Sequence, residues 1–146
     1  EHVISPQRVT QQIFNVLKDE GYVYAETPFV QCVQEGPFDF TRFTHSGHRW
    51  LFKQFEEISS GYVQGAFSSS LFIISYAISG LVRLNIAGVI LRLLFSRVCK
   101  FLDKITDAGW NIDVACGCYF LGKKNKKFNQ IKDASWISKY YSGAQN

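Results

Sequence analysis

The stretch VLKDEGYVYAETP, residues 16–28, contains the end of a helix, a tight turn and a strand. Upstream of it, apolar residues recur at helical spacing after Ser5-Pro6. This pair is typical of a helix start, because serine can cap the first amides and proline is tolerated at the first helical position. Gly21 can take the left-handed conformation that ends a helix, and the apolar run 22–26 predicts a buried strand. A helix, a turn and a strand in this order indicate one arm of an α/β sheet.

Four further segments extend this pattern. Residues 29–43 combine four phenylalanines with glycine and proline, which predicts a structured loop. Thr44 can cap a helix that runs to about Phe55. Residues 56–62 and 114–121 are predicted to be strands, and the second of them, VACGCYFL, is an apolar run bounded by polar or glycine residues.

The middle of the chain is unusually apolar. Residues 68–84 carry no charge before Arg83, and apolar residues keep helical spacing from Ile90 to Ile105. A membrane-spanning helix needs about 20 mostly apolar residues, and residues 66–82 are short of this and contain several serines. We therefore expect two consecutive amphipathic helices packed on the protein's own core, with a position on a membrane surface or across it as the alternatives.

Positive charge is concentrated at the C-terminus. Sixteen basic and twelve acidic residues give a net charge of +4, and six lysines and one aspartate in residues 123–146 give that tail +5. The overall balance is too weak to indicate a nucleic-acid binder, so we expect no nucleic acid among the partners. We interpret the tail as a solvated, partly disordered segment, with attraction to anionic lipid as the alternative.

Cysteine usage points to a reducing compartment. Cys32, Cys99, Cys116 and Cys118 form no C-x2-C pair of the kind that zinc sites use. We expect four reduced thiols in a cytoplasmic protein, with two disulfides in a secreted chain as the alternative. The sequence contains no methionine and starts at Glu1, so we also expect a processed N-terminus or a start inside a larger gene product.

Several catalytic and metal-binding patterns do not occur in this sequence. There is no G-x-G and no G-x-S-x-G, which excludes a local dinucleotide fingerprint and a serine-hydrolase elbow. His45 and His48 lie three residues apart without a third ligand nearby, so we expect surface histidines and no metal. Glu56 and Glu57 are adjacent on a predicted strand and point apart, unlike the paired carboxylates of a glycosidase.

Five segments together resemble the C-terminal half of a class I S-adenosylmethionine-dependent methyltransferase, of the type 11/type 12-like group found in bacterial surface-polysaccharide gene clusters. The segments are EHVISP (1–6), similar to the end of the fourth strand and the start of the next helix; VLKDEG (16–21), similar to a VLKPGG turn; YVYAETP (22–28), similar to the fifth strand; PFDFTRFT (37–44), similar to a P-x-D-F-x-R-F-T element; and VACGCYFLGKK (114–124), similar to the last strand.

The resemblance implies an α/β fold, in the form of a partial Rossmann-like methyltransferase sheet that holds strands four to seven. Residues 1–122 would form the C-terminal part of the methyltransferase domain. An inserted pair of amphipathic helices would occupy about 68–106, and residues 123–146 would be a basic tail.

The resemblance also predicts the order of the strands. The last strand, 114–121, is expected to run antiparallel between strands 22–26 and 56–62. Strand 22–26, apolar on both faces, is expected to be the central one. Its uncovered edge would invite self-association with another chain.

A site is implied at the carboxyl ends of the sheet strands. His2 would be the catalytic base or a contact to S-adenosylmethionine, with a purely structural role as the alternative, and Glu1 would be a second cofactor contact. The residues implied to bind a sugar or other small polar acceptor are Pro28, Asp39, Arg42 and Thr44. Asp39 and Arg42 could instead pin the loop through a salt bridge.

The cofactor implied is S-adenosylmethionine, although the glycine-rich loop and the acidic residue that mainly hold it in this family are absent from this chain. We therefore expect a substrate-side fragment of a methyltransferase of surface-polysaccharide biosynthesis, an enzyme as the full-length protein and inactive by itself. The alternative is a membrane-surface binding module without catalysis, built on the helices of 68–105 and the basic tail. The expected location is the cytoplasm, with peripheral binding to the inner membrane as the alternative.

Overall fold

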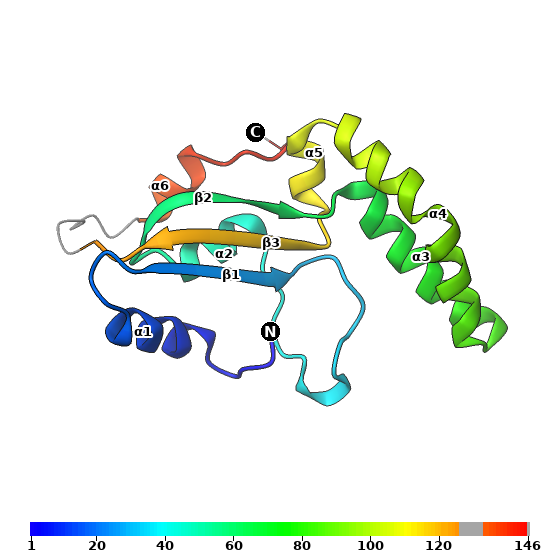
Figure 1. Ribbon diagram of the computed structural model, residues 1–146, viewed down its shortest axis with the longest axis horizontal. Coiled ribbons are helices and arrows are strands. Elements are labelled where there is room, and N and C mark those ends of the chain that lie inside the picture. The colour runs from blue at the N-terminus through cyan, green and yellow to red at the C-terminus, as the bar shows by residue number, and fades with distance from the viewer. Residues whose placement is uncertain (126–132, 146) are drawn as a thin grey trace.

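The computed structural model describes residues 1–125 and 133–145, and the remaining part of the basic tail lies outside the described residues. Figure 1 shows a three-stranded sheet with helices packed beside it and a helical hairpin that projects beyond one end. The elements in chain order are α1 (Pro6–Val16), β1 (Tyr22–Pro28), the 3-10 helix η1 (Gly36–Phe38), α2 (His45–Leu51), β2 (Glu56–Val63), α3 (Ala66–Val82), α4 (Asn85–Ile105), α5 (Ala108–Asp113), β3 (Gly117–Lys123) and α6 (Ala134–Lys139).

The sheet has the order β1-β3-β2, and β3 runs antiparallel to both neighbours. The outer strands therefore run parallel to each other. The predicted antiparallel position of the last strand between the other two is confirmed, and so is the mixed α/β class. The strand begins at Gly117 rather than at Val114, because the short helix α5 occupies the chain up to Asp113.

Strand β1 lies at an edge of the described sheet, so the prediction that it is the central strand is wrong for this part of the chain. It is also not apolar and buried on both faces. Val23 faces the core, whereas Tyr22 and Tyr24 on the opposite face are about 60% exposed (62% and 60%). On that face the Tyr24 and Tyr119 rings stack with their centroids 6.3 Å apart.

The core lies on the other face of the sheet, under α1 and α2. Val23, Phe52, Phe55 and Phe120 form the buried cluster, against which residues of α1 pack. The Phe120 ring stacks on Phe52 with 5.1 Å between centroids, and Phe55 meets Phe14 edge to face, also at 5.1 Å. Aromatic pairs of this kind add to the free energy gained by burying apolar area.

The turn between α1 and β1 differs in detail from the prediction. Ser5 precedes α1 but its side chain makes no capping hydrogen bond. Glu20, not Gly21, takes the left-handed conformation, with φ of 64°. The reason is long-range pairing: the Glu20 amide donates to the Lys124 carbonyl at 2.8 Å, and the Lys124 amide donates to the Gly21 carbonyl at 2.8 Å.

Helix α2 ends earlier than predicted, at Leu51 instead of about Phe55. Its predicted start is confirmed, because the Thr44 hydroxyl accepts a hydrogen bond from the Gly47 amide at 3.1 Å. Near the C-terminus, residues 133–145 are largely exposed as expected, but the expectation of disorder is wrong for them. Helix α6 lies there, and its Ile137 is buried.

The two predicted apolar helices are present as α3 and α4, which pack side by side (Figure 1). Their base is fixed by polar contacts. The buried Asp103 carboxylate accepts from the Gly65 amide at 3.1 Å and the Phe67 amide at 2.9 Å, and the Asn111 side chain accepts from the Ala66 amide at 2.9 Å. These side chains satisfy amides that the first turn of a helix leaves without intrahelical partners.

The expectation that this pair packs on the protein's own core is wrong for most of its length. Sixteen large apolar side chains between residues 66 and 105 are exposed, because the helices contact mainly each other. Among the described helices, none combines the length and apolar character needed to cross a membrane.

Removing the Phe120 side chain tests the core. We expect Phe120→Ala to lower the free energy of unfolding by about 3–5 kcal/mol, because the ring is fully buried and leaves a cavity. Phe101→Ala, on the exposed side of α4, is the matched control and should change it by less than about 0.5 kcal/mol. Urea denaturation followed by circular dichroism measures both, and equal losses would contradict the placement of the core.

Candidate functional site at the carboxyl ends of the outer strands

A small pocket of about 180 Å³ lies where β1 and β2 end and β3 begins. In open α/β sheets, the carboxyl ends of the strands are where ligands bind. The residues that line the pocket are Glu1, Glu26, Thr27, Pro28, Gln31, Gln34, Val63 and Gly117. Two of the residues implied by the family resemblance, Glu1 and Pro28, therefore border it directly.

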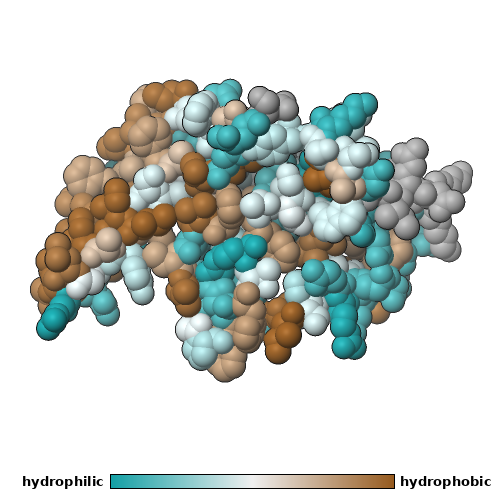
Figure 2. Space-filling view, turned by 180° about the vertical axis from the view of Figure 1, so that it is seen from behind, coloured by the Kyte–Doolittle hydropathy of each residue, from teal (hydrophilic) through white to brown (hydrophobic). Residues whose placement is uncertain are grey.

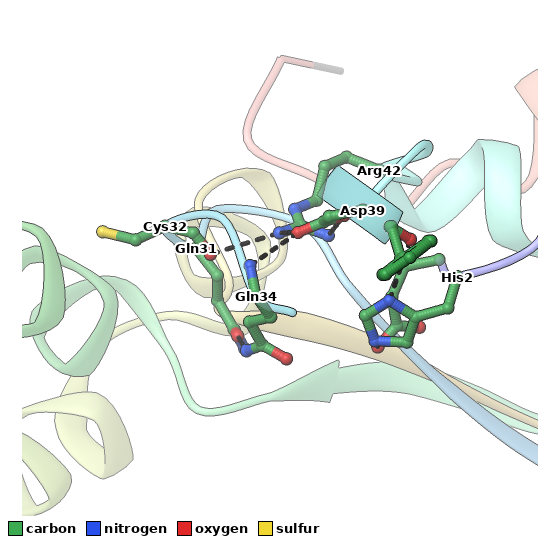
Figure 3. Close-up of polar contacts among 8 residues, drawn as sticks. His2, Gln31, Cys32, Gln34, Asp39 and Arg42 are labelled. Carbon is green, nitrogen blue, oxygen red and sulfur yellow. Dashed lines mark hydrogen bonds and ion pairs between the residues drawn. The ribbon is translucent and has the colours of Figure 1, made fainter. Parts of the chain in front are cut away.

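The loop that follows β1 is held by an ion pair between Asp39 and Arg42. Figure 3 shows the two side chains together, with Cys32 and Gln34 beside them. Arg42 also donates to the Cys32 carbonyl at 3.1 Å, and the Gln34 amide donates to Asp39 at 2.8 Å. The prediction that Arg42 supports this loop through Asp39 is confirmed.

The Asp39 carboxylate is strongly favoured in its charged form. The hydrogen bond from the Gln34 amide is the main cause of a lowered Asp39 pKa, and Arg42 and then His2 lower it further. Only 3% of the side chain is exposed, so these contacts take the place of water. Asp39 and Arg42 thus serve to shape the wall of the site, and their acceptor-binding role stays a prediction.

His2 lies against the same loop, with its ring oriented by two neighbours. Its Nδ1 is 3.1 Å from the Phe38 carbonyl oxygen, which can only accept, so Nδ1 carries the proton of that hydrogen bond. Nε2 is then the nitrogen that can take up a proton, and it lies 3.5 Å from the Glu1 carboxylate. A general base must lie within hydrogen-bonding reach of the proton that it removes, so Nε2 is the candidate atom for that role.

Thr44 is not brought to this pocket. Its hydroxyl caps α2, and its side chain borders a different cavity of about 450 Å³ together with Phe29 and His45. The structure therefore divides the predicted set. Glu1 and Pro28 line the pocket, whereas the side chain of His2 contacts the Phe38 carbonyl. Asp39 and Arg42 brace the loop that carries Gln31 and Gln34, and Thr44 belongs to α2.

Three polar residues at the site were not singled out from the sequence. Gln31 and Gln34 lie three positions apart in the loop after β1, and their side-chain amides are hydrogen-bonded to each other. Thr27, at the end of β1, has a buried hydroxyl oxygen without a hydrogen-bond partner among the described residues. The one sequence signal for these residues is their position near a strand-ending proline: Thr27 directly precedes Pro28, and Gln31 and Gln34 lie in the loop after it.

The two histidines of α2 are buried, so the expectation of surface histidines is wrong. His48 is packed between Phe43 and Phe52, and neither of its ring nitrogens has a partner among the described residues. His45 lies 3.0 Å from the Ser60 hydroxyl, which donates to Glu57. In the described part of the chain, no three histidine, cysteine or acidic residues are grouped so as to hold a metal ion.

All four cysteines are unpaired in the structure, as the reduced-thiol expectation requires. Burial raises the pKa of the Cys118 thiol to about 12 and also raises that of Cys116. A thiol with a raised pKa is a poor nucleophile at neutral pH. Neither buried cysteine is therefore a candidate for covalent catalysis.

The pocket offers two carboxylates, two amide side chains and a hydroxyl within a small volume. Such a mixture of hydrogen-bond donors and acceptors suits a small polyhydroxylated molecule. Comparison of the chain with protein-family models, with curated proteins and with solved structures gives no match. We therefore base the functional proposal on the geometry of the site and on the order of the strands.

The buried His48 makes stability depend on pH. Burial, followed by the nearby charges of His45 and the N-terminus, lowers its pKa to about 4 in the folded protein. The unfolded chain takes up the proton near pH 6.5, so the free energy of unfolding should fall by about 3 kcal/mol as the pH drops from 6.5 to 4. Urea denaturation across this range measures the loss. His48→Phe should reduce it, and the part that remains is assigned to His45, whose pKa burial also lowers. The exposed His2→Gln should leave the loss in place.

The Asp39–Arg42 pair should control how fast the backbone amide of Gln34 exchanges its hydrogen, because that amide donates to Asp39. Arg42→Ala removes the cation that holds the Asp39 carboxylate, so the hydrogen bond from the Gln34 amide should open more often. We expect hydrogen exchange at Gln34 to become at least tenfold faster, which corresponds to about 1.4 kcal/mol. Arg8→Ala, on the exposed side of α1, is the control, and unchanged exchange at Gln34 in Arg42→Ala would show that the loop is held by other contacts.

Proposed function

We propose that this chain is the substrate-side half of a class I S-adenosylmethionine-dependent methyltransferase that acts on a sugar or another small polar acceptor. The observation that carries the proposal is the strand arrangement. Strands β1 and β2 run parallel, and the last strand enters antiparallel between them. This is the arrangement that the resemblance to the fifth, sixth and closing strands of such an enzyme implies.

One edge and one face of the described sheet are uncovered at β1, which supports the proposal that the sheet belongs to a larger domain. Parallel strands normally occur in sheets that are covered on both faces. Here Tyr22 and Tyr24 of β1 are exposed, and the outer edge of β1 is not paired within the described residues. The first strands of a methyltransferase domain and their helices would cover this edge and this face. The self-association of the isolated chain through the same edge stays part of the proposal.

The pocket at the strand ends is small for the cofactor itself. Cofactor pockets are usually larger, about 300–1,000 Å³, whereas the pocket at the strand ends measures about 180 Å³. The chain also has no glycine-rich turn that could approach a nucleotide. The pocket suits the acceptor, and the cofactor would be held by the other half of the domain.

Within this proposal, the chain's own residues position the acceptor and remove the proton of its reacting hydroxyl. Gln31, Gln34 and Thr27 would hydrogen-bond the hydroxyl groups of the acceptor. His2 would accept the proton of the reacting hydroxyl at Nε2, which lies 3.5 Å from the Glu1 carboxylate. The loop braced by Asp39 and Arg42 keeps these groups in place.

The test compares residues 1–146 with a longer product that adds the residues encoded directly before Glu1. Isothermal titration with S-adenosylhomocysteine should give a micromolar dissociation constant for the longer product and no measurable binding for residues 1–146. The longer product should also transfer a labelled methyl group to a saccharide acceptor.

Either of two results would overturn the proposal. If the longer product does not bind S-adenosylhomocysteine, the chain is not part of such a methyltransferase. If residues 1–146 bind it with low micromolar affinity, the chain forms a complete cofactor site and is not a substrate-side half.

A further inference from the structure

The hairpin of α3 and α4, residues 66–105, presents an apolar surface outward. Of the thirty large apolar side chains that are exposed in the described residues, sixteen lie in this hairpin. Figure 2 shows them as a brown area over the hairpin, at the left of that view. We propose that this surface docks the protein on a membrane surface that contains anionic lipids. The proposal goes beyond methyl transfer and does not depend on it.

Helix α3 buries two of its serines and exposes several of its large apolar side chains. Ser69 and Ser75 are 2% and 0% exposed, whereas Ile74 and Leu81 are 52% and 84% exposed. A helix that faces water shows the opposite distribution, with polar residues on its solvent side. The pattern of α3 therefore fits a helix whose outer side meets an apolar environment.

The contact between the two helices is built from small residues. Gly88 of α4 lies so close to α3 that a Cβ atom added to it would be 2.5 Å from the Ser75 carbonyl oxygen. The Gly88 amide donates to the Ser79 hydroxyl at 3.0 Å. Small residues that allow close backbone approach, together with serine hydrogen bonds, are typical of helix pairs that associate in lipid.

The charges of the hairpin identify the kind of membrane. Residues 66–105 contain five basic residues and a single acid, Asp103, which is buried at the helix base and caps α3. Basic residues therefore lie among exposed apolar ones, with Arg97 next to Val98 and Lys104 next to Ile105. Long basic side chains can place their charge at lipid headgroups while their carbon atoms stay in apolar surroundings.

The same charges argue against a second copy of this chain as the occupant. Two identical faces that meet about a twofold axis would bring their arginines and lysines together, and like charges repel. A bilayer surface with anionic lipids offers an apolar layer beside negative charge, which complements both features. No described helix is long and apolar enough to cross the bilayer, so the hairpin would lie in its interface.

The experiment is flotation of the full chain with lipid vesicles. One set of vesicles is pure phosphatidylcholine, and the other contains about 30% phosphatidylglycerol. We expect at least tenfold stronger partitioning onto the anionic vesicles, and weaker partitioning as salt is raised, because ions screen the attraction. The double variant Leu81→Gln/Leu93→Gln should reduce partitioning at least tenfold, since both side chains are highly exposed on the hairpin.

The matched control is Ile4→Gln/Val16→Gln, which changes two equally exposed apolar residues outside the hairpin and should partition like the unchanged chain. Urea denaturation of every variant checks that the fold is retained. The proposal is overturned if the unchanged chain does not float with anionic vesicles, or if Leu81→Gln/Leu93→Gln floats equally well, which would assign binding to the basic tail. A concentration-dependent dimer that the hairpin variant abolishes, without vesicle binding, would assign the surface to a second copy.

Discussion

Within the described part of the chain, every hydrogen bond between strands involves β3, because β1 and β2 pair only with it. Its register places Phe120 opposite Ala25 on one side and Ser60 on the other, so the central core ring is fixed by both pairings at once. The pocket at the strand ends exists for the same reason, since Gly117 lies between the last residues of the two outer strands. A displacement of β3 would thus change the core and the candidate site together.

The antiparallel position of the last strand could be predicted because the family resemblance implies it, and the Asp39–Arg42 pair could be predicted because its two residues lie three positions apart. Residues 114–121 form an apolar run, and an ion pair inside an aromatic loop has few other partners to choose. The turn at residues 20–21 could not be predicted in detail, because its geometry follows from pairing with Lys124, more than a hundred positions away. Local signals contain no information on that contact.

Two other differences have similar physical causes. His45 and His48 are buried because α2 turns that side toward aromatic residues, and their spacing in the sequence does not reveal which side that is. The pocket side chains Thr27, Gln31 and Gln34 form no recognisable motif, since they come together only when the strand ends converge. Helix α5 has six residues, too few to give a periodic signal.

The hairpin and the candidate site are structurally connected through Gln31. This residue borders the pocket at the strand ends and also a cavity of about 340 Å³ that Arg92 and Lys100 of α4 line. The two proposals therefore concern neighbouring parts of the molecule. An acceptor held at a bilayer surface by the hairpin would be presented close to the polar pocket.

The position of β3 in the chain also has a consequence for synthesis on the ribosome. Residues 64–116 separate the end of β2 from the start of β3. At roughly 5–20 residues per second, about 3–12 s pass after β2 is made before its partner strand is complete. During that interval β1 and β2 have no neighbour in the sheet, and the apolar hairpin is made before β3, so the nascent chain exposes strand edges and apolar helices until β3 pairs.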